Sequence, residues 1–279
     1  MDADAYCRDK VAAEGSVLYY GLLFVAETPR RALTALRALG EELREVTDAC
    51  SDLNVGRSKL AWWSEELAWA AQGKPRHPVT QALTLSLESG AIDDAHYRAL
   101  LDGVAERLEA GGFSSRSQMD TLLRASEGAL GTLVACVCAD GKSDHIAFQQ
   151  TLHLALAHAW IARNPRRHGW RSFTYLPADE LARHGVTRED LLSETTSAAL
   201  RAVVNLQLRH ATDQIERAIA TLPPENPEVH LPFLAEAKME RATLNALARS
   251  GGRVLEKPPM ITPLRKLWLA WRTAQEMGV

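Results

Sequence analysis

The stretch TPRRALTALRALGEELREVTDAC, residues 28–50, has the pattern of one long amphipathic helix. Thr28 and Pro29 are typical of an N-cap followed by a proline in the first helical position. Apolar residues then recur at intervals of three and four and form one stripe down about six turns: Ala32, Leu36, Leu39, Leu43, Val46 and Cys50. A helix with such a stripe must pack against other elements along its whole length, so the stretch predicts a helical bundle.

The rest of the chain repeats this spacing, and no convincing run has the alternation of a strand. Glycine and proline punctuate the predicted helices, which cover residues 56–72, 77–89, 94–110, 116–139, 144–163, 178–184, 194–221, 231–249 and 263–276. No break is long or polar enough to be an interdomain linker. The sequence therefore predicts a single all-α domain over residues 1–279.

Composition and charge limit which binding partners and which cellular location are expected for the chain. A length of 279 residues, 46% of them hydrophobic, is enough for a large core. The net charge of −3 gives no reason to expect nucleic acid as a partner. The four cysteines include no CxxC pair, and the N-terminus MDADAYCRDK lacks the apolar region of a secretory signal. No window approaches 18 uninterrupted apolar residues. We expect a cytoplasmic protein, with peripheral contact to a membrane left open.

Stretches along the whole chain together resemble the squalene and phytoene synthase family, the all-helical enzymes that join two prenyl diphosphates head to head. The stretches are YCRDKVAAEGSVLYYGLLF (6–24), VGRSKLAWWSEEL (55–67), KPRHPVTQAL (74–83), TYLPADELARHGVTREDLL (174–192) and PLRKLWLAWR (263–272). They occur in family order. The resemblance implies a helical bundle of the isoprenoid synthase type with a central cavity.

The resemblance also implies where metal chemistry would be. Family enzymes carry two aspartate-rich motifs on facing helices, which hold Mg²⁺ against the substrate diphosphates. Where the first motif stripe has a tyrosine, an arginine and two aspartates, this chain has Arg37, Glu41, Arg44 and Asp48. Their alternating charges favour ion pairs along one helical face over an open metal site. Glu45 matches the second aspartate of the motif and could reach a cation together with Asp48.

The second motif departs further from the family. Counted back from Tyr175, the glutamine, asparagine and two aspartates of the family fall on Ala157, Trp160, Asn164 and His168. Neither Asn164 nor His168 replaces a carboxylate for Mg²⁺. Trp160 places a bulky ring where the family has a small polar group. The resemblance thus predicts a partly filled and less polar cavity.

These departures resemble one branch of the family, which contains the mitochondrial phytoene-synthase-like assembly factor for respiratory complex I. The matching positions include Glu42, Leu43, Val46, Asp48, Pro165, His168 and Arg171. The resemblance to that branch makes catalysis by this chain less expected, and it implies a protein partner in assembly.

A run of basic residues follows the second motif position. An arginine and a phosphate 4 Å apart attract each other by about 4 kcal/mol at an effective dielectric constant near 20. Candidate contacts for an isoprenoid diphosphate or a lipid phosphate are Arg44, Arg163, Arg166, Arg167, His168 and Arg171. The alternative is a solvated basic loop. Ser16, Tyr19 and Tyr20 fall in the entrance stretch of the family pocket, with ordinary packing as their alternative.

Two further features are interpreted as structural. His153 and His158 are five residues apart and do not share a helical face, so they predict no paired metal site. The basic amphipathic helix at residues 263–276 is predicted to pack on the bundle through Leu264, Leu267, Trp268 and Trp271. A membrane surface is its alternative partner.

Two functions compete. The first is a family member that has lost Mg²⁺-dependent condensation and acts, without a cofactor, as an isoprenoid- or lipid-phosphate-binding protein or assembly factor. The second is an active prenyltransferase with a rebuilt diphosphate site, in which Glu45 and Asp48 hold Mg²⁺.

Overall fold

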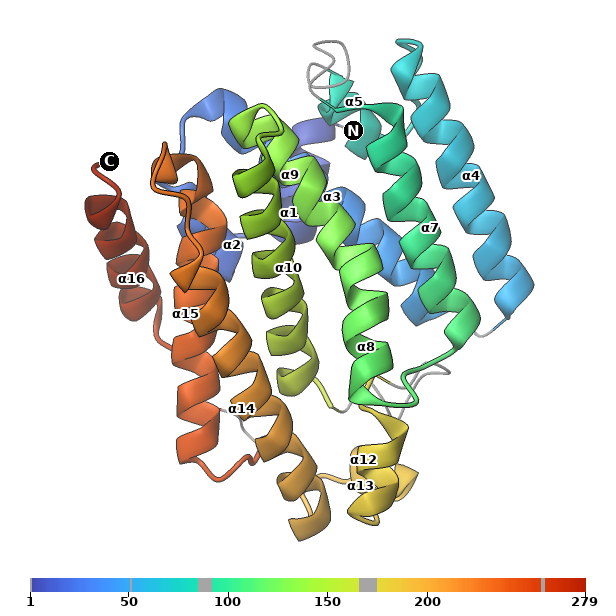
Figure 1. Cartoon of the computed structure of the whole chain (residues 1–279), viewed down its shortest axis with the longest axis vertical. Coiled ribbons are helices and arrows are strands. Elements are labelled where there is room, and N and C mark those ends of the chain that lie inside the picture. Colours follow the sequence, from blue (N-terminus) through green and yellow to red (C-terminus); the bar gives the residue numbers. More distant parts are fainter. Residues whose placement is uncertain (1, 51, 85–91, 166–174, 257–258) are drawn as a thin grey trace.

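The computed structural model describes residues 2–50, 52–84, 92–165, 175–256 and 259–279, and these form helices joined by short connections (Figure 1). Within these ranges no β-strand occurs, so the predicted all-α fold is confirmed. The helices are α1 (Ala3–Val11), α2 (Val17–Leu22), α3 (Glu27–Ala49), α4 (Leu53–Ala71), α5 (Pro78–Ala82), α7 (Asp94–Ala110), α8 (Arg116–Leu123), the π-helical turn η1 (Arg124–Gly128), α9 (Ala129–Ala139), α10 (Ser143–Arg163), α12 (Ala178–Arg183), α13 (Arg188–Leu192), α14 (Ala198–Ala220), the 3₁₀ turn η2 (Pro227–His230), α15 (Leu231–Arg249) and α16 (Pro263–Glu276).

Helix α3 has the predicted stripe but different ends. It begins at Glu27 after the N-cap residue Ala26, so the prediction of Thr28 as N-cap is wrong. Pro29 lies in the first turn, where an amide N–H has no intrahelical acceptor and its absence costs little. The predicted stripe from Ala32 to Val46 is buried, whereas Cys50 lies just beyond the helix end.

Other boundaries also differ from the sequence prediction. Helix α14 begins at Ala198 rather than residue 194, because Ser197 caps it by accepting from the amide of Leu200. The short helix α13 was not predicted from the apolar spacing. Its signal is the capping box formed by Thr187 and Asp190. Residues 85–89 of the predicted helix 77–89 lie outside the described residues.

Helix α10 runs through the middle of the bundle and contacts α9, η1, α14 and α15. In Figure 1, α4 and α7 lie along one side of the bundle and α15 and α16 along the other. The inner face of α10 is fully buried at Leu152, Ala155 and Ala159. Polar side chains of α10 that point inward must therefore find partners within the protein.

Helices α8, η1 and α9 follow one another as a continuous rod over Arg116–Ala139. By length and composition this rod is the one helix in the described part of the chain that could cross a membrane. Because 61% of its apolar window is buried inside the bundle, it equally has the properties of a core helix.

Gly103 of α7 permits a close approach to η1. A Cβ atom at Gly103 would lie 2.1 Å from the backbone oxygen of Ala125. We expect Gly103→Ala to lower the free energy of unfolding by about 1–3 kcal/mol, because backbone cannot move aside cheaply. Gly128→Ala is the control, since its Cβ would have no neighbour closer than 3.7 Å. Urea unfolding compares the two, and equal effects would contradict the expectation.

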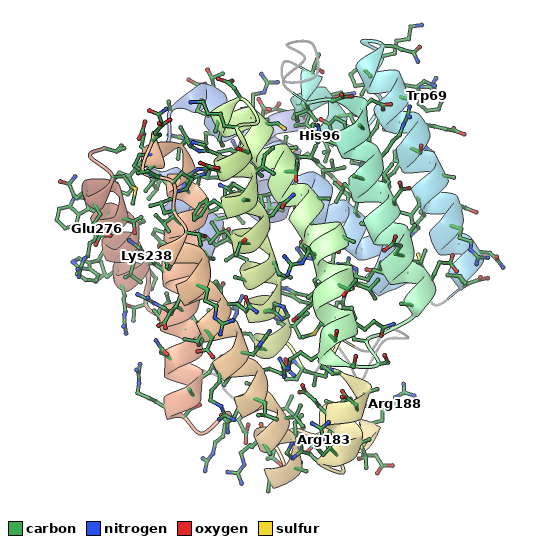
Figure 2. All side chains as sticks on the ribbon, in the orientation of Figure 1. Trp69, His96, Arg183, Arg188, Lys238 and Glu276 are labelled. Atoms are coloured by element: carbon green, nitrogen blue, oxygen red, sulfur yellow. The ribbon has the colours of Figure 1, made fainter. Side chains whose placement is uncertain are left out.

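Helix α16 is amphipathic as predicted, but four of its large apolar residues are exposed. Leu264, Leu267, Trp268 and Trp271 are 79, 40, 47 and 48% exposed, so the prediction that they pack on the bundle is wrong. The buried residues of α16 are Lys266, Ala270, Thr273 and Ala274. The small side chains in this set allow close packing on α15, where Lys238 pairs with Glu276 at the edge of the bundle (Figure 2).

Candidate functional site

A small polar cavity lies in the middle of the bundle, among α3, α7, α10 and α15 and the segment around η1. Its volume is about 60 Å³, which is room for a few water molecules. Sites for small organic ligands commonly measure about 300–1,000 Å³. Any ligand of prenyl size would therefore have to displace side chains that now fill the interior.

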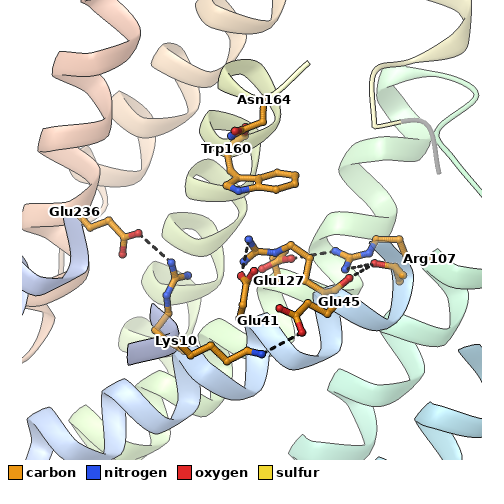
Figure 3. Close-up of polar contacts among 11 residues, drawn as sticks. Lys10, Glu41, Glu45, Arg107, Glu127, Trp160, Asn164 and Glu236 are labelled. Carbon is orange, nitrogen blue, oxygen red and sulfur yellow. Dashed lines mark hydrogen bonds and ion pairs between the residues drawn. The ribbon is translucent and has the colours of Figure 1, made fainter. Parts of the chain in front are cut away.

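Charged side chains dominate the described lining of this cavity. The lining includes Arg37, Arg44, Arg107, Arg163, Glu127, Glu236 and Glu240. Each arginine has a carboxylate partner. Arg37 pairs with Glu236 at 3.0 Å, Arg44 with Glu41 at 2.9 Å and Arg107 with Glu127 at 3.0 Å (Figure 3). Arg163 pairs with Glu240 at 2.8 Å. The cavity is thus lined by a network whose charges compensate one another.

Glu127 belongs to the π-helical turn η1 and meets two arginines. Burial opposes its charge, but Arg44 and Arg107 outweigh that cost and hold the pKa of the Glu127 carboxyl below its usual range. Arg107 is 2% exposed and also donates to the hydroxyl of Thr47 at 3.2 Å. Both members of this pair are therefore charged, and each depends on the other.

Arg44 is held by a ring as well as by acids. Its guanidinium carbon lies 5.0 Å from the centroid of the Trp160 ring, a cation–π distance. Figure 3 shows Trp160 projecting from α10 towards the charged side chains. Trp160 also meets Tyr175 edge to face, with 5.2 Å between ring centroids. The ring of Trp160 thus occupies one wall of the cavity and covers the cation.

Burial affects two other lining groups. It raises the pKa of the Glu240 carboxyl, even though Arg163 lies at 2.8 Å, and neighbouring Glu236 adds to the rise. Burial also lowers the pKa of His153 to about 4, and Arg37 contributes to this shift. His153 is consequently a neutral imidazole near neutral pH, and its Nδ1 donates to the backbone oxygen of Gln149 at 3.0 Å.

Comparison with known proteins identifies the fold and the family. The family model described as squalene/phytoene synthase matches residues 11–267. The chain belongs to the squalene/phytoene synthase family. A crystal structure of a dehydrosqualene synthase in complex with ligand superposes with a TM-score of 0.82 at 16% identity, covering 99% of this chain and 96% of that one. At this identity the likeness shows the fold alone, and it confirms the predicted isoprenoid synthase type.

Relatives of two kinds are similar to this family member. A 15-cis-phytoene synthase of Synechococcus elongatus is 23% identical over 279 residues, which cover 95% of this chain and 91% of that protein. The protein named NADH dehydrogenase (ubiquinone) complex I, assembly factor 6, of Mus musculus is 27% identical over 219 residues. That match covers 74% of this chain and 64% of the mouse protein, so the chain spans about two thirds of its length.

At the first motif of the family, the acids are already engaged by cations or buried. Glu41 accepts from Arg44, and Glu45, whose side chain is 54% exposed, pairs with Lys10 of α1 at 3.1 Å. Asp48 is 6% exposed inside the bundle. Glu41, Glu45 and Asp48 are absent from the described lining of the central cavity, whereas Arg37 and Arg44 are part of it. The structure therefore brings the cations of the first motif into the cavity rather than its acids.

At the second motif of the family, Ala157 and Trp160 line the cavity. Asn164 is the C-cap of α10, and its amide donates to the backbone oxygen of Trp160 at 2.7 Å. The remaining predicted anion contacts lie outside the described residues: Arg166, Arg167, His168 and Arg171. The basic run as an anion site stays a prediction, and Arg163 is the member that the structure places at the cavity.

The described residues do not fit the magnesium cluster that the family implies. Mg²⁺ takes oxygen ligands at about 2.0–2.1 Å in octahedral geometry. Of the two predicted ligands, Glu45 has an ion-pair partner in Lys10, and Asp48 is buried outside the described lining of the central cavity. The facing positions of α10 carry Ala157 and Trp160 in place of polar ligands. Arg44 lines the same cavity, and its positive charge repels a cation.

The three predicted entrance residues lie elsewhere. Ser16 caps α2 and accepts from the amide of Tyr19 at 3.1 Å. Tyr19 lines a separate cavity of about 330 Å³ formed by residues of α1, α2 and α3. Tyr20 lies with its ring centroid 5.9 Å from the ammonium of Lys266. An entrance role for these residues stays a prediction.

Sequence reasoning missed four members of the network: Arg107, Glu127, Glu236 and Glu240. A signal was present for the last two, because they lie four residues apart in the apolar segment LPFLAEAKMERATL (231–244). Charged residues at core positions of a helix need partners inside the protein. The sequence thus indicates that Glu236 and Glu240 need cationic partners, but only the structure shows that these are Arg37 and Arg163.

Proposed function

We propose that this member of the squalene/phytoene synthase family does not condense prenyl diphosphates and acts instead through binding, as an assembly factor. The observation that carries the proposal is the cavity of about 60 Å³ lined by arginine–glutamate pairs. Head-to-head condensation needs room for two prenyl chains and electrostatic support for a leaving diphosphate. Arginines already neutralised by Glu127, Glu236 and Glu240 give little of that support.

Similarity to the complex I assembly factor supports the assembly role and a protein partner. Motif aspartates that family enzymes use are exchanged for basic or neutral residues, such as Arg44 and Asn164, and the motif asparagine is exchanged for Trp160. The alternative of an active prenyltransferase requires Glu45 to leave Lys10 and Trp160 to leave the cavity wall. A prenyl diphosphate at Arg163 would likewise have to displace Glu240.

Condensation can be tested directly. The purified chain is incubated with farnesyl and geranylgeranyl diphosphate in the presence of Mg²⁺, and pyrophosphate release and extractable hydrocarbon are measured. We expect neither to exceed the protein-free background, because the central cavity has no room for the two substrates. The phytoene synthase of Synechococcus elongatus is the positive control. Robust turnover by the chain would refute the proposal.

A further inference from the structure

A second polar cluster is formed by side chains of α8, α10 and α14, outside the described lining of the central cavity. Asp120 comes from α8, His158 from α10 and His210 from α14. One ligand atom from each of the three side chains lies within 4.8 Å of the other two. Two imidazoles and one carboxylate thus converge from three helices.

The atoms that face one another are close but poorly aligned for hydrogen bonding. His158 Nε2 lies 3.0 Å and His210 Nε2 3.7 Å from the same oxygen, Asp120 Oδ1. None of these three buried atoms has a hydrogen bond of good geometry in the described part of the chain. Because buried polar atoms normally have such partners, the arrangement lacks a group that would satisfy all three atoms.

We propose that Asp120, His158 and His210 form a binding site for one divalent transition-metal ion, with Zn²⁺ as the ion of best fit. Zn²⁺ binds imidazole nitrogen and carboxylate oxygen at about 2.0–2.2 Å, which places tetrahedral donor atoms about 3.3 Å apart. The observed 3.0 and 3.7 Å lie on either side of that spacing. A donor set of two nitrogens and one oxygen favours Zn²⁺ over Mg²⁺.

The surroundings suit a bound cation at the edge of the bundle. The side chain of His158 is 1% exposed and fixes the inner ligand, whereas those of Asp120 and His210 are 32 and 21% exposed. Arg116, the nearby cation, is paired with Glu180 at 2.6 Å, so its charge is compensated. The site is independent of the proposed loss of condensation, and a metal held here would join three helices.

A metal titration tests the proposal. Untagged chain is stripped with a chelator and titrated with Co²⁺, whose visible bands report its coordination, followed by Zn²⁺ or Mg²⁺ as competitor. We expect one Co²⁺ per chain, displaced by Zn²⁺ and not by Mg²⁺. We also expect Zn²⁺ to raise the Tm, because an ion that binds the folded state stabilises it.

Variants separate the site from adventitious binding. His210→Gln is expected to weaken Co²⁺ binding by more than about tenfold, since even outer-sphere partners contribute that much. Asp120→Asn is the second variant at a partly exposed position, and the metal-free Tm of each variant reports its folding. His96→Gln removes a histidine of α7 far from the cluster and should keep the wild-type affinity (Figure 2). Absence of Co²⁺ bands at equimolar metal, or equal affinity in His210→Gln and wild type, overturns the proposal.

Discussion

Replacing Glu127 by glutamine is expected to lower the free energy of unfolding by about 3–5 kcal/mol, the loss typical of a buried charge left without its partner. Glu127 is the acid on which both Arg107 and Arg44 depend. Arg107 is 2% exposed, so water cannot take over the role of the carboxylate. Glutamine keeps the shape of the side chain and removes only its charge, which assigns the loss to electrostatics rather than to packing.

Urea unfolding of the Glu127→Gln variant measures this loss. Glu109→Gln is the matched control, because Glu109 pairs with Arg57 at 2.7 Å on the surface, where both side chains are about half exposed. We expect that control to stay close to wild type, since exposed ion pairs contribute little. If the two variants lost similar stability, the central network would not depend on its buried charges.

The apolar stripe and the charged residues of α3 show how much of the structure could be predicted from the sequence. The stripe of α3 predicted a packed helix, because apolar periodicity alone determines which face of a long helix is buried. Alternating charges at Arg37, Glu41 and Arg44 predicted ion pairs, and Arg44 does pair with Glu41. Arg37 pairs instead with Glu236, which is 199 residues away in sequence. Local spacing shows pairs within one helix and cannot show partners that tertiary packing brings together.

For helix α16, the sequence prediction was wrong about which face of the helix packs on the bundle. Its period predicts one apolar face and one polar face, but not which of them the bundle receives. Small residues such as Ala270 and Ala274 allow the closest packing on α15, and this leaves Trp268 and Trp271 outside. The cluster of Asp120, His158 and His210 was missed for a related reason, because its members come from three helices and have no common spacing in sequence.

The stability of the protein should fall steeply below about pH 6.5, because buried histidines such as His153 and His230 resist protonation in the folded state. Burial, with help from Arg37, lowers the pKa of His153 to about 4. Burial and the neighbouring His145 lower the pKa of His230 to about 3. In the unfolded chain both imidazoles take up a proton near about pH 6.5.

Whether stability rises or falls with pH depends on which state, folded or unfolded, binds more protons. Between about pH 6.5 and about pH 4 the unfolded chain carries protons on both histidines and the folded chain on neither, so stability rises with pH. Above about pH 6.5 both imidazoles are neutral in either state, and the free energy of unfolding is at its full value as far as these groups are concerned. The free energy of unfolding then decreases as the pH falls towards the pKa values of the folded state. His153 and His230 together contribute about 2.7 kcal/mol per pH unit to the slope.

Urea unfolding from about pH 8 to about pH 5 measures the slope, and His153→Gln removes one of its sources. His153 is 1% exposed and contacts Phe233 at 4.8 Å between ring centroids, so the variant will lose some stability at every pH. The informative quantity is therefore the slope, which should fall by about 1.4 kcal/mol per pH unit in the acidic range. Above about pH 7 the slopes of variant and wild type should coincide. An unchanged acidic slope would mean that His153 takes up its proton in the folded state, and that the cavity admits the water and the charge that its neutral imidazole now excludes.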